Sequence, residues 1–173
     1  MEVIPDGESF LDWLTASGLL DSLDSAGVER LRREKGLDDA AAAARALRAW
    51  AQKWIERWRN RPKDNFAPDL RRLNALLARS DTYREAVQGK GVIELFERTD
   101  LSRAEALVPL LALQLAKLVT EEDPELVKRC AGANCTLWFL DRTKAHRRMY
   151  CSAAVCGNRA KVAAFRDRQR QSR

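Results

Sequence analysis

All four cysteines of this 173-residue chain lie in one short window near its carboxyl end. They form two pairs of equal internal spacing, Cys130-x4-Cys135 and Cys151-x4-Cys156, with fifteen residues between the pairs. Two such pairs are typical of a tetrahedral four-thiolate zinc site, because each short loop supplies half of the ligands. Four thiolates close the coordination sphere and leave no position for water. The spacing therefore predicts one structural zinc ion rather than a catalytic one.

Other uses of these thiols are chemically open. Disulfides need an oxidising compartment, and the first residues, MEVIPDGESF, carry neither the basic nor the apolar region of a secretory signal. A site of three cysteines and His146, the only histidine, is a second alternative. This histidine stands in KAHRRMY without a partner at ligand spacing, so we expect it at the surface or against a phosphate. The window also lacks the H-x-E and P-C-x-x-C signatures of zinc deaminases.

The residues around the cysteines predict a small treble-clef-like module. TLWFLD is β-prone, DRTKAH is turn-like, and RRMY can form a return strand, while Asp141 is expected to hold an arginine or a turn amide. After Cys156, GNRAKVAAFRDRQRQSR predicts a basic helix whose Val162 and Phe165 pack towards the zinc hairpin. A module of this size cannot bury a core of its own. The metal has to take the place of that core.

Charge divides the chain into two parts. Residues 126–173 contain 12 Lys/Arg against 2 Asp/Glu, whereas residues 1–125 contain 19 Lys/Arg against 23 Asp/Glu. A slightly acidic front with a strongly basic tail indicates a polyanion-binding module joined to a different domain. We therefore expect one domain over residues 1–125 and a second over 126–173. A solvated basic tail without a partner is the alternative that charge alone leaves open.

The first 125 residues predict a mainly helical domain with one β-hairpin. Apolar periodicity indicates helices over 5–17, from 24 or 25 to 36, from 38 or 39 to 59, and over 68–80. Two alternating runs flank Gly89-Lys90-Gly91, which is the pattern of a hairpin over 82–100. A further helix is expected to begin at the capping box Ser102-x-x-Glu105 and to kink at Pro109. The residues expected to face the core are Trp50, Trp54 and Trp58 on the third helix and Leu70, Leu73, Leu76 and Leu77 on the fourth. A stacking platform for bases or ligands is the alternative for the three tryptophans.

The most apolar segment does not predict a membrane protein. ALVPLLALQLAKLV, Ala106 to Val119, is 14 residues long and contains Gln114 and Lys117. A bilayer-spanning helix needs about 20 apolar residues, so this segment is expected to be a core helix. Without a signal sequence or a membrane span, we expect a cytoplasmic protein.

The cysteine window resembles a known family. CAGANCTLWFLDRTKAHRRMYCSAAVCGNRAKVAAFRDR is similar to the CGNR zinc finger, which takes its name from the tetrad Cys156-Gly157-Asn158-Arg159. In that family the finger follows an ABATE domain, and its members are described as stress-induced transcription regulators. The order of elements in the front of this chain is similar to ABATE, although the opening strand usual in the family, resembling LALDFVNT, is not found. The other matching residues of the finger are Cys130, Cys135, Phe139, Asp141, Arg147, Arg148, Cys151, Ser152 and Lys161.

The resemblance implies a mainly α (α+β) protein whose finger binds duplex DNA. The first domain would then sense a signal, bind a small-molecule ligand or mediate assembly, for example as a homodimer. A protein- or RNA-interaction module without sequence-specific DNA binding is the alternative function. An enzyme is not expected, because the sequence offers no Ser/His/Asp set, no second histidine and no phosphate loop. The residues expected to contact nucleic acid are Arg147, Arg148, Arg159, Lys161, Arg166 and Arg170.

Overall fold

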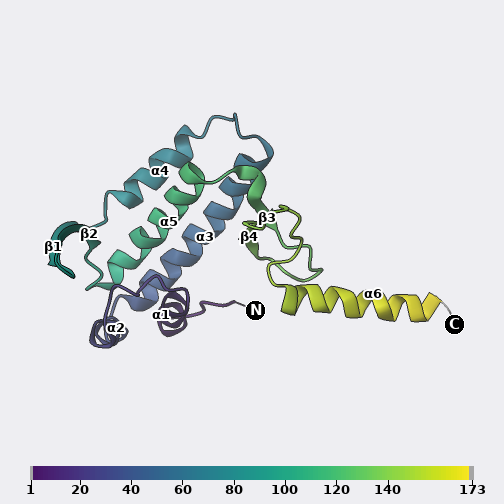
Figure 1. Cartoon of the computed structure of the whole chain (residues 1–173), viewed down its shortest axis with the longest axis horizontal. Helices are drawn as coiled ribbons and strands as arrows, with labels where there is room; N and C mark the ends of the chain where they lie inside the picture. The colour runs from purple at the N-terminus through teal and green to yellow at the C-terminus, as the bar shows by residue number, and fades with distance from the viewer. Residues whose placement is uncertain (1, 172–173) are drawn as a thin grey trace. The chain divides into compact units, whose positions relative to one another are not determined.

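The computed structural model describes residues 2–171 and divides them into two compact units (Figure 1). The first unit ends at Thr120 and the second begins at Glu121. Helices form most of the first unit, a single hairpin is its only described sheet, and the four cysteines lie in the second. This is the mainly helical architecture with a small carboxyl-terminal finger that the sequence predicts. None of the helices in the described range is long and apolar enough to cross a bilayer.

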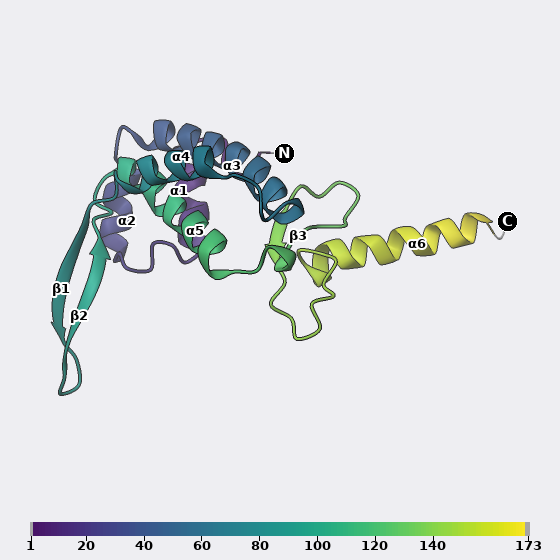
Figure 2. The same cartoon turned by 90° about the horizontal axis from the view of Figure 1, so that it is seen from above.

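Five helices build the first unit. They are α1 (Gly7–Ala16), α2 (Ser25–Arg32), α3 (Leu37–Asn60), α4 (Ala67–Leu77) and α5 (Leu107–Glu121), of which α3, α4 and α5 run side by side (Figures 1 and 2). The side chain of Asp6 caps α1 by accepting from the Ser9 amide at 2.8 Å, and Gly18, at φ +76°, ends that helical segment. The core of the unit includes the buried side chains of Phe10, Leu11, Leu14, Leu20, Leu31, Leu37, Leu101, Leu107 and Leu110.

The tryptophan face of α3 is largely buried. Trp54 and Trp58 lie in the interior, as the helical spacing predicts, whereas Trp50 is half-buried and donates from Nε1 to Asp69 at 3.1 Å. Arg57 forms an ion pair with the other carboxylate oxygen of Asp69. Asp69 therefore occupies an inward position of α4, and its neighbour Leu70 is exposed. The prediction that Leu70 faces the core is wrong, because the polar pair with α3 sets the orientation of this turn.

The predicted hairpin is confirmed. Strands β1 (Thr82–Gln88) and β2 (Ile93–Thr99) pair antiparallel with Glu85 opposite Phe96, and Gly91 adopts φ +88° in the turn.

The prediction that a capping box at Ser102 begins the next helix is wrong. The Ser102 amide donates instead to Asp100 at 2.8 Å, a short 3₁₀ turn covers Ala104–Ala106, and α5 begins only at Leu107. Pro109 consequently lies in the first turn of α5, where no intrahelical partner is needed for its missing N–H, rather than at an interior kink.

The second unit is built from short elements and one long helix. After the 3₁₀ turn Pro124–Leu126, which Asp123 caps, β3 (Val127–Arg129) pairs antiparallel with β4 (Trp138–Leu140). The segment RRMY, predicted to be the return strand, is not a strand. β4 pairs with β3 instead, and the carbonyl of Met149 only accepts one bond from the Ala131 amide at 2.9 Å. A π-helical turn over Ala153–Gly157 then leads into α6 (Asn158–Gln171).

Candidate metal centre and basic helix

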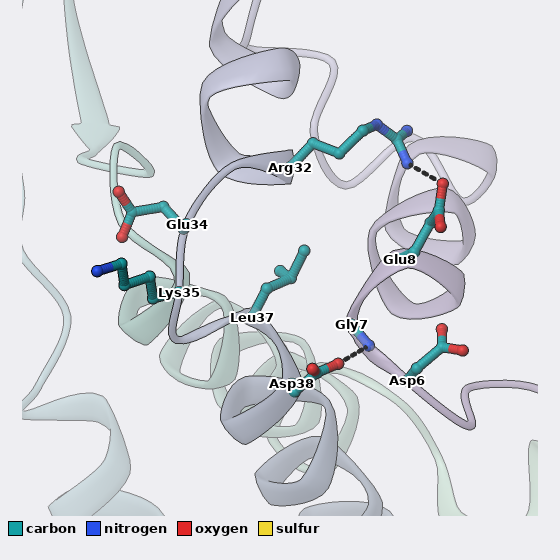
Figure 3. Close-up of a pocket in the computed structure, with 8 residues that line it drawn as sticks. All are labelled: Asp6, Gly7, Glu8, Arg32, Glu34, Lys35, Leu37 and Asp38. Carbon is teal, nitrogen blue, oxygen red and sulfur yellow. Dashed lines mark hydrogen bonds and ion pairs between the residues drawn. The ribbon is translucent and has the colours of Figure 1, made fainter.

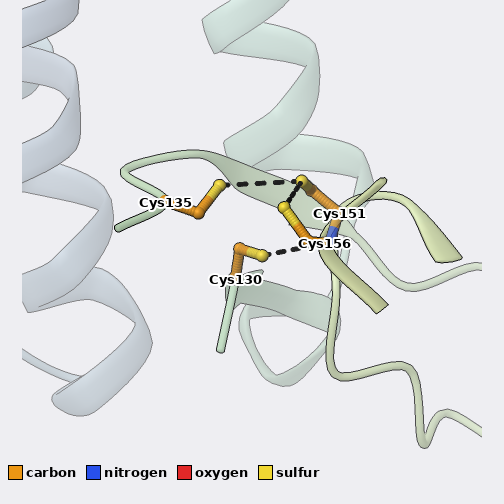
Figure 4. A group of neighbouring side chains, drawn as sticks. All are labelled: Cys130, Cys135, Cys151 and Cys156. Carbon is orange, nitrogen blue, oxygen red and sulfur yellow. Dashed lines mark hydrogen bonds between the residues drawn. The ribbon is translucent and has the colours of Figure 1, made fainter. Parts of the chain in front are cut away.

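The four cysteine sulfurs converge on one point (Figure 4). All four Sγ atoms lie within 4.8 Å of one another, with 3.7 Å between Cys135 and Cys151 and 3.6 Å between Cys151 and Cys156. A tetrahedron with Zn–S bonds of about 2.3 Å has S–S edges of about 3.8 Å. A disulfide would bring two sulfurs to about 2 Å, and none of the four is so paired. The sulfur geometry therefore fits a tetrahedral ion held by Cys130, Cys135, Cys151 and Cys156, as the spacing predicts.

Two tight turns place these sulfurs. Cys130 directly follows β3, and the Cys135 amide donates to the Gly132 carbonyl at 2.9 Å, which closes the first turn. A side chain at Gly132 would place its Cβ 3.2 Å from the Cβ of Cys135, so the turn has little room for one. In the second turn Ser152 caps the π-helical segment that carries Cys156, accepting from the Val155 amide at 3.2 Å. Each x4 loop thus returns its second cysteine to the first.

The electrostatics of the cluster favour a bound cation. The amides of Cys151, at 3.3 Å, and of Gly132, at 3.5 Å, donate to the Cys130 sulfur and lower the pKa of that thiol to about 6. Burial raises the pKa of the Cys151 thiol to about 12. Four thiolates this close repel one another unless a divalent cation lies between them, which makes metal binding and deprotonation a single event.

His146 is not part of this cluster. It is exposed, adopts φ +48°, and places Nδ1 3.1 Å from the carbonyl oxygen of Asp141. The alternative site of three cysteines and one histidine is therefore not formed, and the expected surface position of His146 is confirmed.

A buried aspartate organises the loop between the two cysteine pairs. Asp141 is fully buried and accepts from Lys128 Nζ at 2.7 Å, from the hydroxyl of Thr143 at 2.6 Å and from the Arg148 amide at 2.9 Å. The Lys128 ammonium and the Thr143 hydroxyl hold the pKa of the Asp141 carboxyl well below its usual range. The prediction that Asp141 holds a turn amide is confirmed. The role of Lys128 was not predicted from the sequence. The sequence gives only its position, two residues before Cys130.

The six cations expected to contact nucleic acid fall into two groups. Arg148 is directed at its own unit: its guanidinium donates to the carbonyls of Tyr150 and Cys151 and lies 4.9 Å from the centre of the Phe139 ring. It therefore braces the second cysteine loop against β4. The other five are exposed, one in the loop and four on α6: Arg147, Arg159, Lys161, Arg166 and Arg170.

Helix α6 is exposed along nearly all of its length. Val162 and Phe165, which the sequence predicted to pack towards the zinc hairpin, are 48% and 55% exposed, so that prediction is wrong. The Asp141 network connects β3, β4 and the loop between the cysteine pairs without these two side chains. Val155 is also exposed, and with Val162 it borders a shallow groove of about 450 Å³ that Arg159 and Arg166 line as well.

Sequence profiles of two families match the chain. The ABATE profile, described as "putative stress-induced transcription regulator", matches residues 1–122, and the CGNR zinc finger profile matches residues 127–169. The chain belongs to the ABATE family. No curated protein matches it. The two matched ranges follow the two units, and the finger match together with the sulfur geometry indicates zinc as the metal and a zinc-binding regulator as the protein class.

A pocket in the ABATE domain lies where α1 and the start of α3 meet (Figure 3). Its volume is about 370 Å³, and two contacts join its polar groups: Arg32 pairs with Glu8 at 3.3 Å, and the Gly7 amide donates to Asp38 at 2.7 Å. A Cβ at Gly7 would lie 2.8 Å from the Leu37 carbonyl carbon, so glycine permits this close approach. Binding pockets for small molecules are mostly apolar, whereas these contacts join α1, α2 and α3 to one another. A small-molecule ligand of this domain stays a prediction.

Proposed function

We propose that this ABATE protein is a zinc-dependent transcription regulator whose finger, with one zinc ion per chain, binds duplex DNA through α6. The observation that carries the proposal is the distribution of side chains on this exposed helix. Arg159, Arg166 and Arg170 recur at spacings of seven and four residues and share one flank, whereas Lys161 and Arg168 share the other. On α6 the exposed apolar side chains of Val162 and Phe165 lie between the two flanks by helical spacing, and exposed Val155 precedes them in the π-helical turn.

This arrangement suits the major groove. An α-helix with its side chains is about 10–12 Å across, and the major groove of B-DNA is about 12 Å wide. A helix in the groove presents its two flanks to the two phosphate backbones and its central stripe to the base edges. The cationic flanks of α6 match the phosphates, and the methyl groups of thymine are apolar partners for Val162 and Phe165. The zinc knuckle supplies the rigid base from which the helix extends.

The proposal involves no catalysis. Four thiolates leave the metal without an open coordination position, so the ion serves folding rather than the activation of water or substrate. Regulation follows from the combination of the finger with an ABATE domain that transmits a signal or an assembly state.

The salt dependence of duplex binding tests the proposal. Each phosphate contact contributes about 0.9 to the slope of log affinity against log salt concentration. The double variant Arg166→Ala/Arg170→Ala is expected to weaken binding to all sequences and to flatten that slope by up to about two. Arg142→Ala is the matched control, because Arg142 lies off the helix and forms an ion pair with Glu122. Failure of the zinc-loaded protein to bind any duplex at about 50 mM salt would favour an RNA- or protein-interaction module.

A second measurement separates base contacts from phosphate contacts. On a duplex selected for tight binding, replacing thymine with uracil removes only the methyl group. One buried methyl contributes about 0.8 kcal/mol, so the affinity of the unmodified protein is expected to fall about fourfold at a contacted thymine. Phe165→Ala or Val162→Ala should be insensitive to that same change. Equal affinity for both duplexes would assign α6 to the phosphates alone.

A further inference from the structure

The hairpin of the ABATE domain lacks a partner that its composition requires. Figure 2 shows the ribbon of β1 and β2 extending beyond the helices, and Ile93 and Leu95 are 74% and 65% exposed. Within the described part of the chain the sheet has only these two strands. An isolated two-stranded hairpin is at best marginally stable in water, and an unpaired edge is a template for another strand. The hairpin thus presents an open pairing edge with apolar side chains.

The hydrogen-bonding groups of β2 that face outward can be assigned from the register. The Gly89 amide donates to the Val92 carbonyl at 2.9 Å, and the Asp100 amide donates to the Asp81 carbonyl at 2.7 Å. Hydrogen-bonded pairs alternate with non-hydrogen-bonded pairs along an antiparallel ladder, so the even-numbered residues of β2 bond to β1. The backbone groups of Ile93, Leu95, Glu97 and Thr99 are therefore directed to the free edge.

We infer that this edge pairs with the same edge of a second copy of the chain, antiparallel and centred on Phe96. In that register Glu94 lies opposite Arg98 of the second copy, and a two-fold interface repeats the pair. Phe96 lies opposite its own counterpart. These three positions are the non-hydrogen-bonded pairs of the new ladder, in which side chains approach most closely. The result is a four-stranded sheet in the order β1, β2, β2, β1.

The charged residues favour pairing through β2 rather than β1, and with a second copy of the chain rather than with an unrelated segment. The same symmetric pairing of β1, centred on its middle residue, would place Glu85 against Glu85 and is disfavoured. On β2, Arg98 already forms a 3.0 Å ion pair with Glu85 of its own hairpin and lies 4.9 Å from the centre of the Phe96 ring. The second copy would add the carboxylate of its Glu94 on the other side of the same guanidinium. In this register Leu95 lies opposite Glu97 and Ile93 opposite Thr99 of the second copy, so Phe96 is the β2 residue that meets an apolar partner. The choice of a second copy therefore rests on the match of Glu94 with Arg98, which a segment of unrelated sequence has no reason to provide.

The inference is independent of DNA binding. It gives the ABATE domain a role in assembly and places two fingers in one particle, so that any polyanion contact made by one finger is made twice. A finger that binds weakly alone gains apparent affinity when a second finger is tethered to it.

Sedimentation analysis of the zinc-loaded full chain tests the dimer. The unmodified protein is expected to be a concentration-dependent dimer, and Glu94→Arg or Arg98→Glu alone should raise the dissociation constant about tenfold or more, because each creates two like-charge pairs. An equimolar mixture of these two variants should dimerise again, since every pair across a mixed interface is then of opposite charge. Glu85→Gln is the matched control: it removes the pair within one hairpin and should leave dimerisation intact.

Each other outcome overturns the inference. An unmodified protein that stays monomeric up to about 100 μM would show that the edge is not an interface of useful affinity. Dimerisation that the single charge reversals do not weaken would place the interface elsewhere on the chain. Loss of dimerisation that the mixture does not restore would show that the two residues act within their own hairpin.

Discussion

Removal of zinc is expected to unfold the finger and leave the ABATE domain folded. The free energy of zinc binding in zinc-finger peptides is about 10–16 kcal/mol at pH 7, more than a unit of this size can obtain from its own contacts. Without the knuckle, α6 becomes an isolated helix of 14 residues with exposed apolar side chains, and helices shorter than about 12–15 residues are marginal in water. The ABATE domain keeps its own buried core around Phe10, Leu11 and Leu14.

The size of the effect follows from the helix lengths. α6 supplies 14 helical residues, whereas α3 and α5 alone supply 24 and 15 and α1, α2 and α4 add to these. Chelation, or Cys151→Ser, should therefore remove roughly a sixth of the α-helical circular dichroism signal. The thermal transition of the ABATE domain should remain. His146→Ala is the matched control and should keep its zinc and its full signal.

Metal analysis before and after chelation measures the zinc content per chain, and circular dichroism measures the loss of helix. A zinc content of one per chain, lost together with roughly a sixth of the ellipticity, is the expected result. A chelated protein with unchanged ellipticity and unchanged amide protection in 127–171 would refute the reasoning. Loss of the whole helical signal would show that the two units do not fold separately.

Two further substitutions test the internal polar groups. No described residue accepts from the buried Nε1 of Trp54, so Trp54→Phe loses packing but removes an unsatisfied donor, and the free energy of unfolding should change by less than about 1 kcal/mol. Trp50→Phe instead removes the bond to the buried Asp69 and should cost about 1–3 kcal/mol; urea unfolding of the full chain compares the two. In the finger, Asp141→Asn should lower zinc affinity about 10–100-fold in competition with a chelator, while Asp167→Asn on the exposed α6 should not.

Sequence reasoning succeeded where local spacing determines the structure. The clustering of the four cysteines could be read from the chain, because two x4 loops bring their own cysteines together whatever the rest of the chain does. The hairpin was equally local, since alternation on both sides of Gly89-Lys90-Gly91 leaves few other conformations. The first unit's helices followed from apolar periodicity to within a few residues at most ends. Family resemblance and composition agreed on the division between the helical part and the finger.

Prediction from the sequence failed where a polar partner distant in the chain outweighs the apolar pattern. On α4, hydropathy favours Leu70 for the core, but Asp69 turns inward because Trp50 and Arg57, on another helix, supply its partners. The return strand was assigned to RRMY because β-propensity does not reveal that the residues before Cys130 already pair with β4.

The prediction that Val162 and Phe165 of α6 pack towards the zinc hairpin also failed. An amphipathic pattern shows that Val162 and Phe165 share a face, but it cannot show whether their partner belongs to the same chain. Both side chains are exposed, so the apolar stripe is available to a ligand outside the finger. This is the feature on which the proposed DNA interface rests.

The most direct test of the central claim is duplex binding by the zinc-loaded full chain and by the same protein after chelation. At about 50 mM salt the loaded protein is expected to bind random-sequence duplex DNA, with affinity that falls steeply as salt rises. The chelated protein should bind far more weakly, because α6 no longer has a rigid base. Duplex binding that is unchanged by chelation, or no binding by the loaded protein, would contradict the account.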